Sequence, residues 1–172
     1  MAFVVEDGTA RADATSYLSV ADADDLLSIY NNATWNAATT VDKERYLQIA
    51  TQYLDLRYGD RLDGYKVDSN VQALLWPRYG MMDMDGWVLD HEVLPSRLKQ
   101  ATAEAALRRA TFGPLMPDDT EQQGKLAAES TKVGPITVSQ EFLGGRGESV
   151  KFAKIDSLLL PFLHSNARLV RH

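Results

Sequence analysis

The sequence predicts a mainly α-helical fold: a small helical bundle with a projecting β-hairpin, followed by a short C-terminal helix and a tail. Three observations support this prediction. Several stretches carry apolar residues at helical spacing behind capping residues. A later stretch alternates apolar and polar residues around a run of glycines. The 172 residues are 45% hydrophobic, which suits one ordinary core, so we expect a single domain.

The strongest helical patterns lie in the first third of the chain. Ser19 is a suitable N-cap for a helix over about residues 20–31, because its hydroxyl can accept a backbone N–H of the first turn. The stretch "TTVDKERYLQIATQYLDLRYGDR" predicts a longer helix, capped by Thr39 or Thr40 and ending at Gly59. Its apolar stripe is rich in tyrosine, and we interpret that stripe as core packing.

Two further helices are expected before the hairpin. A short one follows Ser69 and stops before Pro77, because proline disfavours helical geometry in the residue before it. A longer one begins at Pro95 and stops at Gly113. It carries a seam of small residues, which allows close helix–helix approach either inside the domain or against a neighbouring copy.

The period of the sequence changes from helical to two in the last third. The stretches "KVGPITVSQEF" and "ESVKFAKI" predict the two strands of the hairpin, and "LGGRG" between them predicts its tip. A helix capped by Asp156 and interrupted at Pro161 follows. The predicted parts are a helical body (about 1–113), a loop (about 114–130), a β-hairpin (about 132–154) and a C-terminal helix with a tail (about 155–172).

Charge and composition restrict the possible functions. The chain has no cysteine, a net charge of −6 and no apolar run long enough to span a membrane. We therefore expect a soluble protein without disulfides. The acidity is concentrated in residues 1–38, and no basic cluster is visible. Because proteins that grip phosphates use such clusters, this pattern weighs against nucleic acid as the main ligand.

No motif points to catalysis. The three histidines, His91, His164 and His172, occur singly, without the spacing of a zinc or di-iron site. The "GGRG" run lacks the lysine and hydroxyl residue of a phosphate-binding loop, and no nucleophile elbow is present. We expect neither an enzyme nor a bound metal or cofactor.

The stretch "ALLWPRYGMMDMDGW" contains two of the three tryptophans and has two interpretations. One is a platform on which nucleic-acid bases stack. The other is a structural corner in which the tryptophans are buried and Arg78 pairs with a nearby acid. We favour the corner, because the surrounding residues are mostly acidic. The corner residues are Trp76, Pro77, Arg78, Gly86 and Trp87.

The order of five segments resembles a known family. "VVEDGTARADATSYLSVADADDLL", "ALLWPRYG…DMDGW", "LPSRLKQATAEAALR" and "KVGPITV" with a closing "IDSLLLPFL" together resemble tailed-phage proteins encoded among head and tail genes. That family is similar to head-completion or head–tail connector (adaptor) proteins. It also carries the label of a DnaT-like single-stranded-DNA-binding protein. The resemblance covers nearly the whole chain.

The connector resemblance implies a structural protein of the virion. Copies of the chain would form a ring, with twelve subunits, that lines the DNA channel below the portal at the head–tail interface and bridges to the tail, after assembly in the host cytoplasm. Its partners would be other copies, the portal protein and a tail or stopper (completion) protein, and DNA would pass without specific binding. An acidic subunit suits a channel through which DNA must slide.

The predicted contacts of such a ring fall on two sets of residues. Subunit contacts are expected at Leu98, Ala101 and Ala105 of the small-residue seam and at Gly144, Gly145, Arg146 and Gly147 of the hairpin tip. Portal contacts are expected at Phe162, Leu163, Arg168, Leu169 and Arg171. Glutamate at Ala101 and Ala105 should then abolish rings while leaving the monomer folded.

The alternative function is single-stranded-DNA binding, which the DnaT-like label implies. The stacking platform would consist of Trp76, Tyr79 and Trp87 with Arg78, and backbone contacts would come from Arg108 and Arg109.

Overall fold

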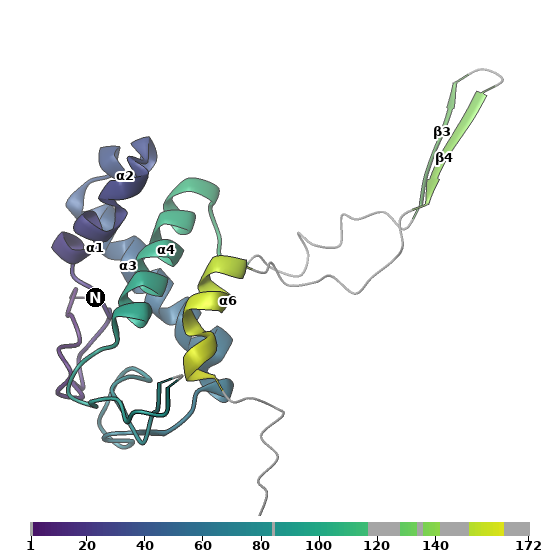
Figure 1. The fold of residues 1–172 in the computed structure, drawn as a ribbon. Coiled ribbons are helices and arrows are strands. Elements are labelled where there is room, and N and C mark those ends of the chain that lie inside the picture. The colour runs from purple at the N-terminus through teal and green to yellow at the C-terminus, as the bar shows by residue number, and fades with distance from the viewer. Residues whose placement is uncertain (1, 84, 117–127, 134–135, 142–151, 164–172) are drawn as a thin grey trace, which may run out of the picture. The chain divides into compact units, whose positions relative to one another are not determined.

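The computed structural model describes residues 2–83, 85–116, 128–133, 136–141 and 152–163 (Figure 1). The fold is mainly α, as the sequence predicts. The chain groups into two compact units, residues 1–115 with 152–172 and residues 116–151. In the part of the chain that is described, no helix has the length and apolar character needed to cross a membrane.

The first helices begin where their caps predict. Helix α1 spans Val20–Leu27 and is followed by a 3₁₀ turn, η1 (Ser28–Tyr30), and helix α3 spans Thr40–Tyr58. The hydroxyl of Ser19 accepts the backbone N–H of the third residue after it at 3.1 Å, and the hydroxyl of Thr39 does the same at 3.2 Å. Both predicted caps are confirmed. A short helix that the sequence does not predict, α2 (Ala33–Ala37), buries Trp35.

Helix α3 does not end on a left-handed glycine. Gly59 keeps a right-handed φ of −53° and begins a further 3₁₀ turn, η2 (Gly59–Arg61). A Cβ atom at Gly59 would lie 2.7 Å from Cδ1 of Leu75. A larger residue at this position would therefore displace the end of the Leu75 side chain.

Helix α4 (Ser96–Phe112) occupies the middle of the helical unit and packs against α1, α2, α3 and α6 (Figure 1). Small residues on several sides of α4 allow its neighbours to approach closely. Its buried positions are Leu98, Ala101, Thr102, Ala103, Glu104, Ala105, Ala106 and Leu107. The small-residue seam thus lies inside the unit.

The segment between α3 and α4 contains a two-stranded ribbon, β1 (Tyr65–Lys66) paired antiparallel with β2 (Arg78–Tyr79). The helix predicted after Ser69 is wrong, because turns occupy residues 68–75. The carboxylate of Asp68 accepts two backbone N–H groups just downstream, at 3.2 and 3.3 Å, so the local side chain competes with helical hydrogen bonding.

The C-terminal helix begins earlier than predicted. Helix α6 spans Ala153–Leu159 and continues into a 3₁₀ turn, η3 (Leu160–Phe162), which accommodates the predicted interruption at Pro161. Asp156 lies in the first turn and is not the cap; its carboxylate accepts the hydroxyl of Tyr58 at 2.6 Å. This contact ties α6 to α3.

The hairpin lies earlier in the chain than predicted. Strands β3 (Ala128–Val133) and β4 (Ile136–Glu141) pair antiparallel, with Val133 opposite Ile136. Residues 134–135, a Gly-Pro pair in the sequence, therefore connect the two strands. The first predicted strand, residues 132–142, contains all of β4 and the end of β3, whereas the start of β3 falls in the predicted loop. The "LGGRG" run expected at the tip lies outside the described residues, as does most of the predicted loop.

Candidate nucleic-acid interface

Trp76 is a core residue and does not form a stacking surface. Its side chain is only 3% exposed, and its ring packs edge-on against Phe162 with centroids 5.3 Å apart. The peptide bond to Pro77 is cis. The structural-corner interpretation is therefore confirmed for Trp76.

Arg78 holds this corner together through backbone carbonyls. Its guanidinium donates hydrogen bonds to the carbonyl oxygens of Asp63 and Gly64, both at 2.7 Å, and more weakly to those of Leu62 and Leu75 at 3.4 Å. Burial lowers the pKa of this guanidinium. The sequence-based expectation of a partner carboxylate is corrected, because the five N–H donors of arginine match a turn rich in carbonyls. Arg78 is thus not available to a phosphate.

A buried Tyr–Asp pair holds the preceding residues against α3. The hydroxyl of Tyr17 donates to the carboxylate of Asp55, and the backbone N–H of Leu75 donates to both side chains, at 3.1 Å to the hydroxyl and 3.2 Å to the carboxylate. Burial raises the pKa of Asp55 to about 6, against opposing hydrogen bonds from Tyr17 and Leu75. Sequence reasoning did not identify this pair, since its members are 38 residues apart.

The ribbon presents two tyrosines to solvent. Tyr65 and Tyr79 are cross-strand partners, 68% and 49% exposed, with ring centroids 5.6 Å apart and planes inclined at 33°. Successive side chains of a strand point to opposite faces, so Arg78 points inward and Tyr79 outward. Tyr79 is a predicted platform residue. Tyr65 was not predicted, because nothing in the sequence shows which residue pairs with Tyr79.

Trp87 lies on a hydrogen-bonded turn and is exposed to solvent. Its side chain is 76% exposed, which contradicts the prediction that it is buried in the corner. The Asp83 carboxylate accepts the backbone N–H groups of Asp85 and Trp87 at 3.0 and 2.8 Å, and Gly86 adopts a φ of +86°. The predicted Asp-Gly turn is thus confirmed, but it presents the indole to solvent.

The basic residues predicted to contact a DNA backbone are partly engaged elsewhere. Arg108 pairs with Glu104 at 3.0 Å, and its guanidinium lies 5.0 Å above the ring of Phe152. Arg109 lies on the same helix and is half-buried. Arg108 therefore joins α4 to the start of α6.

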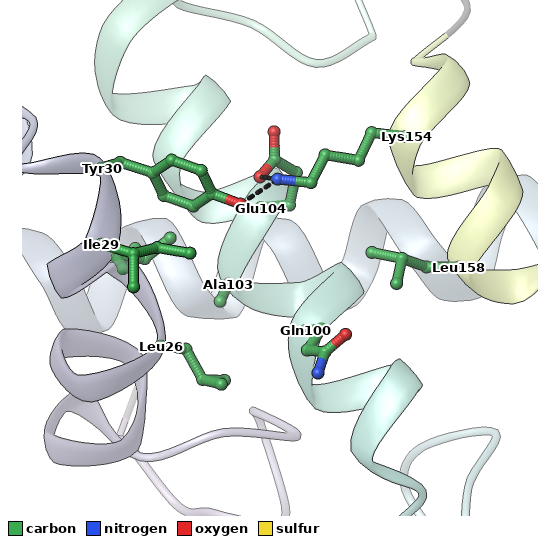
Figure 2. A pocket seen from close by; sticks show the side chains of 9 residues that line it. Leu26, Ile29, Tyr30, Gln100, Ala103, Glu104, Lys154 and Leu158 are labelled. Atoms are coloured by element: carbon green, nitrogen blue, oxygen red, sulfur yellow. Dashed lines mark hydrogen bonds and ion pairs between the residues drawn. The ribbon is translucent and has the colours of Figure 1, made fainter.

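A groove of about 210 Å³ lies among α1, η1, α4 and α6, and Figure 2 shows the side chains that line it. The ammonium of Lys154 donates to Tyr30 and, at 2.7 Å, to Glu104. Although burial opposes it, these two contacts raise the pKa of Lys154. Since each polar side chain of this trio already has a partner, we interpret the cluster as a tie between helices.

The predicted contact residues of a ring are distributed differently from expectation. Leu98, Ala101 and Ala105 are buried inside the helical unit, so of the two alternatives for the small-residue seam the structure shows internal packing. Phe162 and Leu163 are also buried, and Leu163 forms a β-bridge with Leu62. The remaining predicted contacts lie outside the described residues: Gly144, Gly145, Arg146, Gly147, Arg168, Leu169 and Arg171.

Among the described residues, no group of three or more His, Asp or Glu side chains is placed to hold a metal ion. The remaining candidate site is therefore an aromatic surface. The fold and this site define a mainly α-helical protein that displays a tyrosine pair on a short ribbon and a tryptophan on a turn that follows the ribbon in the chain.

The chain belongs to the family described as "Putative DnaT-like ssDNA binding protein", whose model matches residues 1–172. This match corresponds to the second label of the resemblance seen in the sequence and does not support the connector label. No curated protein and no solved structure matches the chain.

Proposed function

We propose that the protein binds single-stranded DNA and that the Tyr65–Tyr79 pair is the stacking surface for bases. The observation that supports this function is the pair itself. Its two rings are exposed side by side on a ribbon that the Arg78 hydrogen bonds fix in place. Stacking requires only the face of a base, so such a surface accepts any sequence. The family description supports the same function.

The charge around the pair indicates weak binding. Of the two basic residues nearest to Tyr65 in the sequence, exposed Arg61 in η2 can meet one phosphate. Lys66 in β1 lies on the opposite face of the ribbon, and its ammonium donates to the carbonyl of Gln72 at 3.4 Å. Asp60 and Asp68 flank them and reduce the local positive potential. Stacking therefore has to supply most of the affinity.

Fluorescence anisotropy with a labelled oligothymidine tests this function directly. Replacing both Tyr65 and Tyr79 with alanine should lower the affinity roughly 10- to 100-fold, since stacking contributes about 1–3 kcal/mol per base. The exposed positions of both rings mean that the fold should tolerate the change.

The matched control is Phe112→Ala, which removes a 77% exposed aromatic ring at the end of α4. It should leave oligonucleotide binding unchanged. Equal affinities for the wild type, the double variant and this control would disprove the assigned surface. Failure of the wild type to bind would disprove the function itself.

A second candidate function, a subunit of a phage head–tail connector, is favoured by the hairpin. Within the described residues each strand of β3–β4 pairs only with the other, and a lone two-stranded hairpin is marginally stable in water. Its outer edges can add a strand from another chain. In this role the partners would be other copies in a ring of twelve, the portal protein and a tail or stopper protein, at the head–tail interface of the virion. Neither candidate function involves catalysis.

Negative-stain electron microscopy of the purified chain, alone and with a tailed-phage portal protein, tests the second candidate. Rings or added density on the portal would support it. A monomer in both samples, together with oligonucleotide binding, would exclude it in favour of the first candidate.

A further inference from the structure

A second cavity lies apart from the tyrosine pair and the Figure 2 groove. It measures about 520 Å³ and is formed by three segments: the turn around residue 85, the start of α4 and the end of η3. Its lining residues are Asp83, Asp85, Leu89, Pro95, Ser96, Arg97, Pro161 and Phe162. We refer to it as the acidic cleft.

The acidic cleft combines an apolar wall with an excess of negative charge. Leu89 and Pro161, which are only partly buried, supply apolar surface. Two carboxylates, Asp83 and Asp85, are opposed by one guanidinium, Arg97. The Asp83 carboxylate also closes the turn, whereas the side chain of Asp85 is exposed. Such a surface suits a basic side chain, whose aliphatic stem packs on the apolar wall while its charged end reaches a carboxylate.

The chain contains a segment of matching chemistry immediately beyond this cleft. Residues 164–172, "HSNARLVRH", lie outside the described residues and follow directly on Leu163, next to the cleft-lining Phe162. The segment has two arginines, Arg168 and Arg171, around a Leu-Val pair and contains no acidic residue. Its Ser-Asn dipeptide is of the type that favours turns.

We propose that the acidic cleft binds this C-terminal segment of the same chain, with an arginine against Asp85 and the Leu-Val pair against the apolar wall. Attachment favours the contact, because a tethered segment is present at a millimolar effective concentration. A contact that would be weak between separate molecules is then populated within one. This inference does not depend on oligonucleotide binding, which is assigned to a different set of residues.

Paramagnetic relaxation enhancement in the full chain tests this inference. Because the chain has no cysteine, His172→Cys creates a unique site for a nitroxide label. The amide signals of Asp85, Leu89 and Arg97 should lose intensity, and those of α2 should not. Asp85→Lys should restore the lost intensity.

The matched control is Asp25→Lys, the same charge change at an exposed position of α1, which should leave the broadening in place. Combining Asp85→Lys with glutamate at Arg168 and Arg171 should bring the broadening back. The proposal is wrong if the amide signals of the labelled chain without charge changes show no broadening. It is also wrong if neither Asp85→Lys nor the charge reversal at Arg168 and Arg171 alters that broadening. Broadening seen only between labelled and unlabelled molecules in a mixture would also overturn it, because the occupant would then be a second copy.

Discussion

At the scale of single residues, the site depends on a side chain that touches no ligand. Arg78 donates to carbonyls just before β1 and, more weakly, to the carbonyl of Leu75 before β2. The outward position of Tyr79 is therefore a consequence of the inward position of its neighbour. The sequence indicated that the W-P-R motif forms a corner. It did not indicate the carbonyl partners, because they belong to a turn whose path is set by tertiary packing.

Replacing Arg78 with lysine should lower the free energy of unfolding by about 2–4 kcal/mol, because a single ammonium cannot satisfy several carbonyls that remain buried. Urea denaturation measures this change. Arg45→Lys is the control, since Arg45 is exposed and pairs with Asp42 at 3.3 Å on the surface, where a change below about 1 kcal/mol is expected. Equal losses for both variants would show that the carbonyl contacts add nothing.

Asp55 predicts a specific pH dependence. Its pKa is about 6 in the folded protein and near the ordinary 3.8 when unfolded, so the folded state holds the proton more tightly between these values. Its contribution to stability is therefore largest below pH 4 and falls as the pH rises to 6, by up to about 3 kcal/mol. Above pH 6 this contribution should be constant.

Urea denaturation across pH 4 to 7 should show this slope in the wild type and lose it in Asp55→Asn, which has no titrating group. Asp25→Asn, at an exposed carboxylate, is the control and should retain the slope. An Asp55 carboxyl carbon that titrates near pH 4 by NMR would contradict the expected pKa.

At the scale of elements, local signals predicted some boundaries and failed at others. The caps of α1 and α3 depend on a side chain and the turn that follows it, so the sequence was sufficient. The hairpin was misplaced because the glycine run drew the prediction away from the Gly-Pro connection between Val133 and Ile136. The 69–75 segment was misassigned because Asp68 forms local hydrogen bonds that a periodicity analysis does not detect.

The small-residue seam of α4 is buried, so the effect expected of substitutions at its alanines changes from loss of a ring to loss of stability. Ala101 and Ala105 have no exposed surface, so glutamate there should unfold the helical unit and cannot serve to test a ring. Ala105→Leu, a milder change, should cost about 1–3 kcal/mol through overpacking. Gln100→Leu, on the exposed side of the same helix, is the control and should change stability by less than about 0.5 kcal/mol. Thermal unfolding followed by circular dichroism measures both, and a stable Ala105→Leu variant would show that the seam is loosely packed.

At the scale of the whole molecule, net charge and site composition lead to different expectations. A chain of net charge −6 without a basic cluster argues against a strong nucleic-acid ligand, which favoured the connector label of the resemblance over its single-stranded-DNA label. The structure leaves aromatic rings exposed, and the family description names single-stranded DNA. The acidic net charge is compatible with single-stranded-DNA binding if that binding depends on stacking and only weakly on phosphate contacts. Composition could not show this, because it does not distinguish a buried Trp76 from an exposed Trp87.

The salt dependence of oligonucleotide binding tests whether the affinity comes mainly from stacking. One phosphate contact, from Arg61, would give a slope of about −0.7 for log K against log salt, since each contact on a single strand contributes about −0.7. Affinity for oligothymidine should then fall only about threefold between 50 and 200 mM salt. Arg61→Ala should reduce the slope by about 0.7, while the tyrosine double variant should lower affinity at every salt concentration without changing the slope. A steep slope that persists in Arg61→Ala would place binding on a basic surface elsewhere, and the tyrosine pair would then be only a cross-strand packing contact.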